Sequence, residues 1–412
     1  MQMTDPGFVR QRSYRFYKGD APYFPHGVNL WYGMNLGATP EGQIRLVREL
    51  DRLSAIGINN LRIMGAFEGP DVAPWRAIPS SQPEPGEFSE EIMKGLDFLL
   101  KEMADRQMTA VICLGNFWHW SGGFAQYVSW VTGTPIPYPP PAERGNWLRF
   151  MRYSAQFFEL RKALELYQQS SEQLLRRINT FTGKAYRDDP TIMAWQLANE
   201  PRGLNHRKAY LDWIRESALM FRSLAPHQMV SIGSEGKTPT RLAGTYFPVA
   251  HEIPEIDYLT CHIWPENWDW YDPQKPEATF SAAMEKARKY LDYHQRIARK
   301  IGKPLVLEEF GLARDLRHFM PLAPTSYRDQ FFQQMISLTE RSIEAGEPLT
   351  GLAYWAWGGD GRPGEAGGFW RLGDDFLGDP PHEPQGWYSI YESDRSTLEL
   401  IAQVRLGKGN LE

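Results

Sequence analysis

The hydrophobic residues of this chain fall into eight short apolar runs, separated by longer segments in which apolar residues recur at helical spacing. Residues 40–56 illustrate the helical pattern, because Leu46, Leu50 and Leu53 share one face after a proline at the start. The short runs are too short for average helices and predict buried strands. These strands are expected at residues 27–31, 60–64, 109–114, 191–200, 229–234, 258–263, 305–309 and 351–357.

The alternation of strands and helices, repeated eight times, predicts an α/β fold, the (β/α)₈ or TIM barrel, rather than an open sheet. In residues 1–26, a glycine-containing turn at 18–20 predicts a short N-terminal β-hairpin that closes the barrel floor. Long loops are predicted after strands 3 and 8, and the first of them turns helical over residues 147–178. No repeat or linker indicates a second domain, so residues 1–412 are expected to form a single barrel domain.

Composition excludes several classes of partner. The formal net charge is −5 without a basic stripe, so neither nucleic acid nor a membrane surface is an expected partner. Cys113 and Cys261 lie inside predicted strands and are expected to be buried thiols. No stretch is apolar for long enough to span a bilayer, and residues 1–7 lack a signal-peptide pattern, which leaves the compartment open. We expect a monomer.

Two predicted strands end on carboxylates. The fourth ends on the amide of Asn199 and the carboxylate of Glu200, and the seventh ends on Glu308 and Glu309. Because side chains alternate along a strand, only one acid of the seventh strand is expected to continue the inward row, and we assign it to Glu309. Strand ends of this kind open onto the active-site face of a barrel, and two carboxylates there suit the cleavage of a glycosidic bond. A helix cap at Asn199 and a salt bridge at either glutamate are the alternative interpretations.

Other candidate residues share this face of the predicted barrel. Arg62 ends the second strand, His262 lies near the end of the sixth, and Trp355 belongs to the eighth. Each has a structural alternative, namely a helix cap, a core histidine and simple packing. An arginine near Glu309 would keep that group ionised, while the charge of Glu309 would raise the pKa of Glu200 and keep it protonated.

Aromatic residues gather in the predicted loops of the same face, at spacings that fit neither a strand nor a helix. Exposed rings there suit the apolar faces of pyranose sugars, although about half are expected to be loop packing. The aromatic residues are Trp31, Tyr32, Phe117, Trp118, Trp120, Tyr127, Trp130, Trp264, Trp268, Trp270, Tyr271, Phe369, Trp370 and Trp387.

No His-Glu-x-x-His motif, cysteine pair or calcium loop occurs, so neither a metal nor another cofactor is expected.

Three motifs carry a likeness to a known family: Trp-Gln-Leu-Ala-Asn-Glu-Pro-Arg at 195–202, Leu-Glu-Glu-Phe-Gly at 307–311 and His-Ile-Trp at 262–264. Together they resemble glycoside hydrolase family 5, in clan A, and specifically its β-mannanase branch. The Asn-Glu-Pro motif alone indicates only the clan, and the flanking blocks are more specific. Those blocks lie at 120–123, 126–127, 135–140, 268–270, 355–357 and 378–381.

The resemblance implies roles for the polar residues. Glu200 corresponds to the family's acid/base and Glu309 to its nucleophile. Asn199 is expected to bond the sugar 2-hydroxyl, and Arg62 to brace the nucleophile. His262 is expected to belong to the same substrate site.

The resemblance also implies roles for six other residues. Trp355 is expected to form the platform under the scissile sugar, and Arg202 to lie toward the leaving-group subsites. One departure concerns Trp264, because many family members carry a tyrosine there whose hydroxyl touches the nucleophile. Trp264 is expected to bind substrate, as are Trp31, Trp118 and Trp120.

The expected function is retaining hydrolysis of β-1,4-mannosidic bonds in β-mannan or manno-oligosaccharides, by an endo-acting mannanase. An exo-acting β-mannosidase is the alternative, because the long loops after strands 3 and 8 can wall off one end of a groove. A β-1,4-glucanase and a non-catalytic sugar-binding barrel are further alternatives. The family resemblance suggests a secreted or periplasmic protein, and a cytoplasmic protein is the alternative.

Overall fold

The computed structural model describes residues 7–240 and 242–407, and its centre is one sheet of eight parallel strands in the order β8-β7-β6-β5-β4-β11-β10-β9. Backbone hydrogen bonds join the two ends of this sheet, from Asp257 N–H to the Val230 carbonyl at 2.8 Å and from His262 N–H to the Glu235 carbonyl at 3.0 Å. The sheet therefore closes, and the predicted TIM barrel is confirmed. The strands are β4 (His26–Asn29), β5 (Asn60–Met64), β6 (Thr109–Cys113), β7 (Ile192–Gln196), β8 (Met229–Ser231), β9 (Leu259–Ile263), β10 (Leu305–Phe310) and β11 (Leu349–Tyr354).

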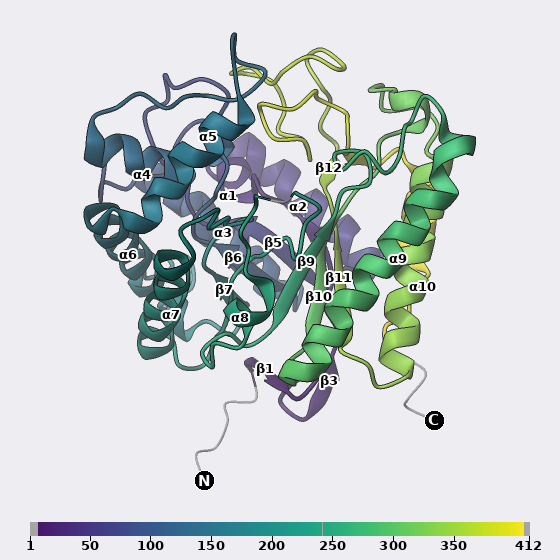
Figure 1. Cartoon of the computed structure of the whole chain (residues 1–412), viewed down its shortest axis with the longest axis horizontal. Coiled ribbons are helices and arrows are strands. Elements are labelled where there is room, and N and C mark those ends of the chain that lie inside the picture. Colours follow the sequence, from purple (N-terminus) through teal and green to yellow (C-terminus); the bar gives the residue numbers. More distant parts are fainter. Residues whose placement is uncertain (1–6, 241, 408–412) are drawn as a thin grey trace.

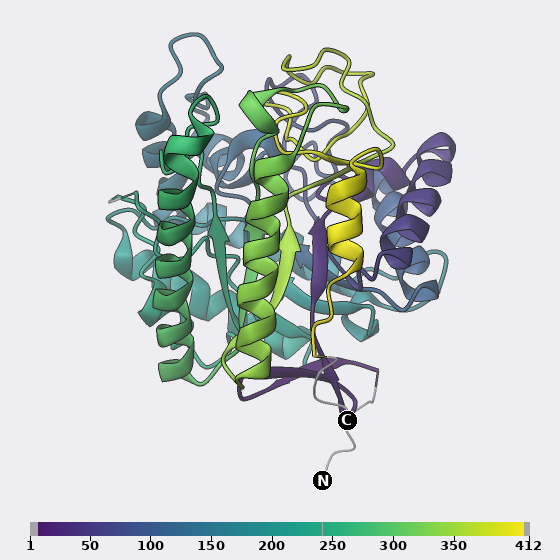
Figure 2. The same cartoon turned by 90° about the vertical axis from the view of Figure 1, so that its right-hand side faces the viewer.

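Helices surround the barrel, and Figure 2 shows α9, α10 and α11 covering one side of it. The predicted helix start at residues 39–41 is confirmed, because Pro40 opens α2 and the Thr39 hydroxyl accepts the Gly42 N–H at 3.1 Å. The predicted helical stretch 147–178 is divided into α5, η2 and α6. The helices are α1 (Gly33–Gly37), α2 (Pro40–Ala55), α3 (Glu90–Asp105), η1 (His119–Ser121), α4 (Gly123–Thr132), α5 (Trp147–Ser154), η2 (Ala155–Glu159), α6 (Arg161–Arg176), η3 (Tyr186–Asp188), α7 (Arg207–Leu224), α8 (Phe247–His251), α9 (Pro276–Ile301), η4 (Asp315–Arg317), α10 (Ser326–Glu344) and α11 (Arg395–Ala402).

A small antiparallel sheet lies beneath the barrel, at the end opposite the long loops (Figure 1). It has three strands, β1 (Val9–Arg12), β2 (Arg15–Lys18) and β3 (Ala21–Tyr23). The antiparallel pair β2 and β3 confirms the predicted hairpin around the turn at 18–20, and β1 adds a further strand to it. Val9 and Phe16 pack against inward-facing barrel residues, and apolar burial of this kind seals the floor. The barrel residues in this cluster are Val111, Met193, Ala194, Met229, Tyr258 and Val306.

Two long segments cover the other end of the barrel, as predicted (Figure 1). The segment after β6 contains α4 and α5, and the segment after β11 contains the short strands β12 (Trp357–Gly359) and β13 (Ile390–Tyr391). Asp394, at the start of α11, holds the second segment in place through buried ion pairs with Arg314 and Arg328. Both segments therefore stand over the carboxyl ends of the strands, where barrel enzymes place their active sites.

Cys113 and Cys261 are buried free thiols, as expected from their places in strands. Within the described residues, no helix is both long and apolar enough to cross a membrane. Asp374 and Asp375 accept backbone N–H groups of Arg371 and Arg362, each at 2.9 Å.

Candidate active site

The side chains of β10 do not follow simple alternation. Val306 and Glu308 continue the inward row, since both line a small internal cavity at the barrel floor. The register with β9 shifts between Leu307 and Glu309, and this bulge turns Glu309 into the interior as well. The expectation that only one acid of this strand reaches the interior is therefore wrong, because it assumed a regular pleat.

Glu200 lies just beyond β7, and its φ of 49° places it in the left-handed region. Its N–H donates to the Gly233 carbonyl at 2.9 Å, while the preceding Asn199 forms a β-bridge with Asn116. Strained backbone of this kind is held by its surroundings and occurs often at functional sites. The turn directs the Glu200 carboxylate over the barrel mouth, where Trp118 Nε1 donates to it at 2.7 Å.

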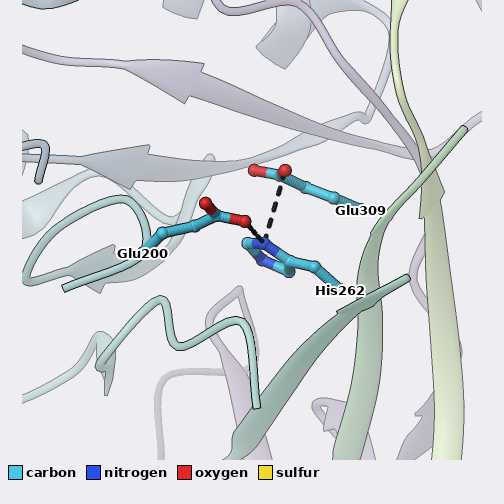
Figure 3. A group of neighbouring side chains, drawn as sticks. All are labelled: Glu200, His262 and Glu309. Carbon is cyan, nitrogen blue, oxygen red and sulfur yellow. Dashed lines mark hydrogen bonds and ion pairs between the residues drawn. The ribbon is translucent and has the colours of Figure 1, made fainter. Parts of the chain in front are cut away.

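Glu200, His262 and Glu309 converge from three different strand ends (Figure 3). His262 Nδ1 lies 2.6 Å from Glu200 Oε1 and 3.3 Å from Glu309 Oε2. One side-chain N or O atom of each residue lies within 4.8 Å of those of the other two. The carboxyl groups of retaining glycosidases stand about 5–5.5 Å apart, whereas those of inverting enzymes are about 6.5–9.5 Å apart. The short spacing fits the retaining geometry.

Arg62 lies below these groups and is paired with Glu309. Its guanidinium contacts the Glu309 carboxylate directly and donates to Asn199 Oδ1 at 2.8 Å and to Gln196 Oε1 at 2.8 Å. A second ion pair links Arg62 Nε to Glu308 Oε2 at 3.4 Å. The arginine is 4% exposed, and its pairing inside a protein is only weakly screened by solvent.

The surroundings of Glu200 and Glu309 set the pKa values of the two carboxyl groups apart. Although burial acts to lower it, the pKa of His262 is raised to about 10 by the charges of Glu309 and Glu200. Although burial acts to raise it, the pKa of Glu200 is lowered to about 2 by its bond with His262, the charge of Arg202 and the Trp118 N–H.

Burial raises the pKa of Glu309 to about 7, against the lowering effects of His262 and Arg62. The order is the reverse of the expected one, because His262 and Trp118 both bond to Glu200. With the pKa of Glu200 at about 2 and that of Glu309 at about 7, the pair holds one proton between these two pH values.

Glu200, His262 and Glu309 are also close enough to serve as ligands to a metal ion. Glu309 already accepts from Arg62, however, and Glu200 from Trp118. A cation among them would also face the guanidinium of Arg62 and the imidazolium of His262, which repel it. This arrangement favours proton transfer over metal binding.

A cavity of about 510 Å³ opens above the carboxylates. Aromatic rings form much of its wall, and Glu200 and Glu309 contribute its charged base. This combination of apolar rings with a few polar groups suits a sugar ring. The wall is formed by Trp118, Trp120, Pro140, Pro141, Trp147, Asn199, Glu200, Arg202, Glu235, Thr240, Trp264, Asn267, Trp268, Glu309, Trp355, Phe369, Pro380, His382, Glu383, Pro384 and Trp387.

Most of the predicted substrate residues lie on this wall: Asn199, Arg202, Trp118, Trp120, Trp264 and Trp355. Arg62 and His262 lie just below it, in contact with the carboxylates. Trp31 does not reach the cavity wall, because it packs behind Trp120 and donates to the Gly378 carbonyl at 2.9 Å. Trp264, which stands where many family members carry a tyrosine, packs against Trp355 and Tyr388. Glu309 is held by Arg62 and His262.

Several cavity residues were missed by sequence reasoning, among them Glu235, His382, Glu383 and Trp147. Glu235 follows β8 and binds Arg202 through two hydrogen bonds of 2.6 and 2.9 Å. Its position just after a strand is the same signal that identified Glu200. His382 and Glu383 follow the Gly-Asp-Pro-Pro block, and Trp147 opens α5. The position of these three residues in the cavity wall depends on contacts between loops, which leave no pattern in the sequence.

Comparisons with known proteins agree with this geometry. A sequence profile described as GH family 5 beta-mannosidase-like matches residues 6–407. The solved structure of a glycoside hydrolase family 5 mannosidase from Rhizomucor miehei is similar, with a TM-score of 0.88, 38% identity and coverage of 96% of both chains. The curated mannan endo-1,4-beta-mannosidase 7 of Arabidopsis thaliana is 29% identical over 363 residues, which is 85% of this chain and 77% of that protein.

The endo-beta-1,4-mannanase of Thermotoga petrophila shares the fold, with a TM-score of 0.68 at 23% identity, covering 93% of this chain and 76% of that one. The family profile spans nearly the whole chain, including the strand ends that carry both glutamates. The chain belongs to glycoside hydrolase family 5, in its β-mannosidase-like group.

Proposed function

We propose that this protein hydrolyses β-1,4-mannosidic bonds in mannan or manno-oligosaccharides with retention of configuration, and that residues 1–412 form one catalytic domain. The observation that carries the proposal is the pair Glu200 and Glu309, whose oxygens approach within 4.8 Å at the base of an aromatic cavity. The relatives named as mannosidases and mannanases support mannose as the sugar.

In the proposed first step, Glu309 attacks the anomeric carbon while Glu200 protonates the departing oxygen. The shared proton must therefore sit on Glu200 when the bond breaks. His262 Nδ1 stands between the two carboxylates, and it stabilises whichever of them carries the charge. In the second step, Glu200 takes a proton from water, which then releases the sugar from Glu309.

Neighbouring groups would hold the substrate. We propose that the Asn199 amide bonds the 2-hydroxyl of the sugar being transferred and that Trp355 lies under its ring. Arg202 stacks on Trp118, with its guanidinium carbon 4.7 Å from the ring centroid, and both line the cavity. We propose that this pair faces the leaving-group side.

The proposal is tested by following products from unbranched mannohexaose, with the anomeric form of the first product read by NMR. Dimers to tetramers in the β form are expected from an endo-acting retaining enzyme. Initial α products would contradict retention. Cellohexaose is the matched substrate, and a rate on it equal to that on mannohexaose would contradict specificity for mannose.

A specific observation favours exo action as a second candidate. His382, in the segment after β11, meets two rings of the segment after β6, with centroids 4.8 Å from His119 and 6.2 Å from Trp147. Contact between the two segments closes the cavity on that side, and a closed pocket suits chain ends. Release of mannose alone from the first minutes of the same time course would establish this second function.

The native state is also a proposal. We propose that the protein acts as a monomer and that it is exported, as the family resemblance suggests. Light scattering after gel filtration checks the first point, because a dimer would have twice the mass of 47.5 kDa. Fractionation of the native cells checks the second.

A further inference from the structure

A third acid, Glu308, lies directly beneath the proposed catalytic pair. It is 2% exposed and lines the small internal cavity at the barrel floor, whereas Glu309 lines the large cavity above. The β10 bulge separates the two levels, since it lets consecutive residues both point inward. Glu308 therefore has no direct access to a substrate in the large cavity.

The partners of Glu308 are the groups that hold the catalytic carboxylates. Its Oε2 accepts from Gln196 Nε2 at 2.7 Å and pairs with Arg62 Nε at 3.4 Å. Gln196 Oε1 in turn accepts from the same Arg62 Nε at 2.8 Å. On the other side, His262 Nε2 lies 3.8 Å from Glu308 Oε2. One carboxylate thus touches both cationic supports of the pair above it.

Burial of a carboxylate is costly unless the charge is paired, and the neighbouring inward position of the strand holds the apolar Val306. An apolar residue at 308 would fill the barrel without that cost, so packing alone gives no reason for an acid here. The local charge balance does give one. Four carboxyl groups lie among three cationic side chains, and the excess negative charge retains a proton within the cluster. The acids are Glu200, Glu235, Glu308 and Glu309, and the cations are Arg62, Arg202 and His262.

We propose that Glu308 is a positioning residue, which fixes Arg62 and the protonated ring of His262 beneath Glu309 and Glu200. The inference rests on the proposed function of that pair. Glu308 acts through two supports at once, because Arg62 orients Glu309 while His262 bonds Glu200. Its negative charge also favours the protonated forms of the groups around it.

Titratable groups on several strands around Glu308 respond to its charge. Removing one negative charge lowers the pKa of each titratable neighbour, so all shifts have the same sign. The facing groups are Arg62 of β5, Cys113 of β6, Tyr258 before β9, Cys261 and His262 of β9, and Glu309 of β10.

The substitution Glu308→Gln keeps the size of the side chain and its ability to accept from Arg62, but removes the charge. We expect kcat to fall about tenfold with KM changed less than about twofold, because substrate does not touch this residue. The alkaline limb of kcat/KM moves to lower pH by about half a unit or more, and Glu308→Asp restores part of it. An unchanged profile and rate would overturn the proposal.

Glu49→Gln is the matched control. Glu49 is buried and paired with Arg45 at 3.0 Å, but this pair lies outside the cavity. The control is expected to lose stability without a shift in the alkaline limb. A limb that moves equally in both variants would mean that Glu308 has only a structural role.

A measurement on the unsubstituted protein covers the case in which the variant does not fold. Nitrogen NMR of the His262 ring is expected to find both nitrogens protonated at pH 8. A neutral ring there would overturn the proposal. Because this readout needs no substrate, it separates failure of the positioning role from failure of the proposed function, which would instead leave the protein inactive on mannans.

Discussion

Two buried arginine–carboxylate clusters in this barrel have opposite charge balances. In the Asp394 cluster, Arg314 and Arg328 share one acid, with ion-pair distances of 2.8 and 2.7 Å. In the Arg62 cluster, one guanidinium faces both Glu308 and Glu309. The first cluster has more cations than acids, and the second has more acids than cations.

The two clusters also differ in their hydrogen bonding. Asp394 accepts from both arginines and from the Tyr391 N–H at 2.9 Å, so its oxygens are fully engaged. It joins α10, the segment after β11 and α11, and it lies away from the cavity. Acids of the Arg62 cluster instead share a proton and border the cavity. One cluster holds the chain together, whereas the other is arranged to exchange a proton.

The largest effect is expected from removing either proposed catalytic acid. Glu309→Ala and Glu200→Ala should each lower kcat on manno-oligosaccharides by about 10⁴-fold or more while leaving the unfolding midpoint nearly unchanged. With an aryl β-mannoside, whose leaving group departs without acid catalysis, azide should restore turnover in both, giving α-mannosyl azide with the first variant, since direct attack inverts, and β-mannosyl azide with the second. A Glu309→Ala variant with the wild-type rate would refute its role.

The reverse pattern is expected when the Asp394 cluster is broken. Asp394→Asn leaves two buried guanidinium groups facing each other without a counter-charge, which should cost about 3–5 kcal/mol of unfolding free energy. Because the cluster lies away from the cavity, kcat of the folded fraction should change less than about threefold. Urea unfolding measures the first quantity, and a steady-state assay below the transition measures the second. Lost activity with full stability would contradict the distinction between the clusters.

The proton held by the Arg62 cluster should appear in the pH dependence. The pKa of Glu309 lies at about 7, so above that pH the pair loses its last proton and Glu200 has none to donate. We therefore expect kcat/KM to fall as the pH rises through about 7. The folded protein should also lose stability as the pH rises from 4.5, the ordinary pKa of a glutamate, to about 7, because over that range only the unfolded chain releases the proton. Activity that stays constant to pH 9 would contradict this assignment.

The smallest effect is expected from one donor to Glu200. Trp118→Phe removes the N–H that bonds the ionised carboxylate at 2.7 Å, so the pKa of Glu200 should rise and kcat should fall about three- to tenfold. The acidic limb of the pH profile should move upward. Trp195→Phe is the matched control, since Trp195 Nε1 donates to Gln228 at 2.6 Å away from the cavity. It should lower stability without moving the limb.

The strands of the barrel were predictable because burial on both faces makes each one a continuous apolar run. The run over 60–64 matches β5 residue for residue, and the polar ends of β7 and β10 indicated the carboxylate site. The start of α2 was predictable from Thr39 and Pro40, because both residues act only on the first turn of the helix.

What could not be predicted depends on contacts between distant segments. A pleat of period two assigned Glu308 outward, whereas the bulge against β9 turns both acids inward. Trp31 looked like a binding residue, because no local pattern reports that Trp120 covers it. The separate floor strand β1 was missed as well, since its four residues are too few for a periodic signal.

The floor sheet sets an order of events during synthesis. Val9 and Phe16 leave the ribosome early, yet the barrel residues that cover them extend to Val306. Bacterial ribosomes add about 20 residues per second and slower ones about 5, so these side chains wait about 15–60 s for their final neighbours. Throughout that interval the newly made strands expose apolar side chains and unpaired edges. The nascent chain is therefore most dependent on chaperones at the segment that later seals the finished barrel.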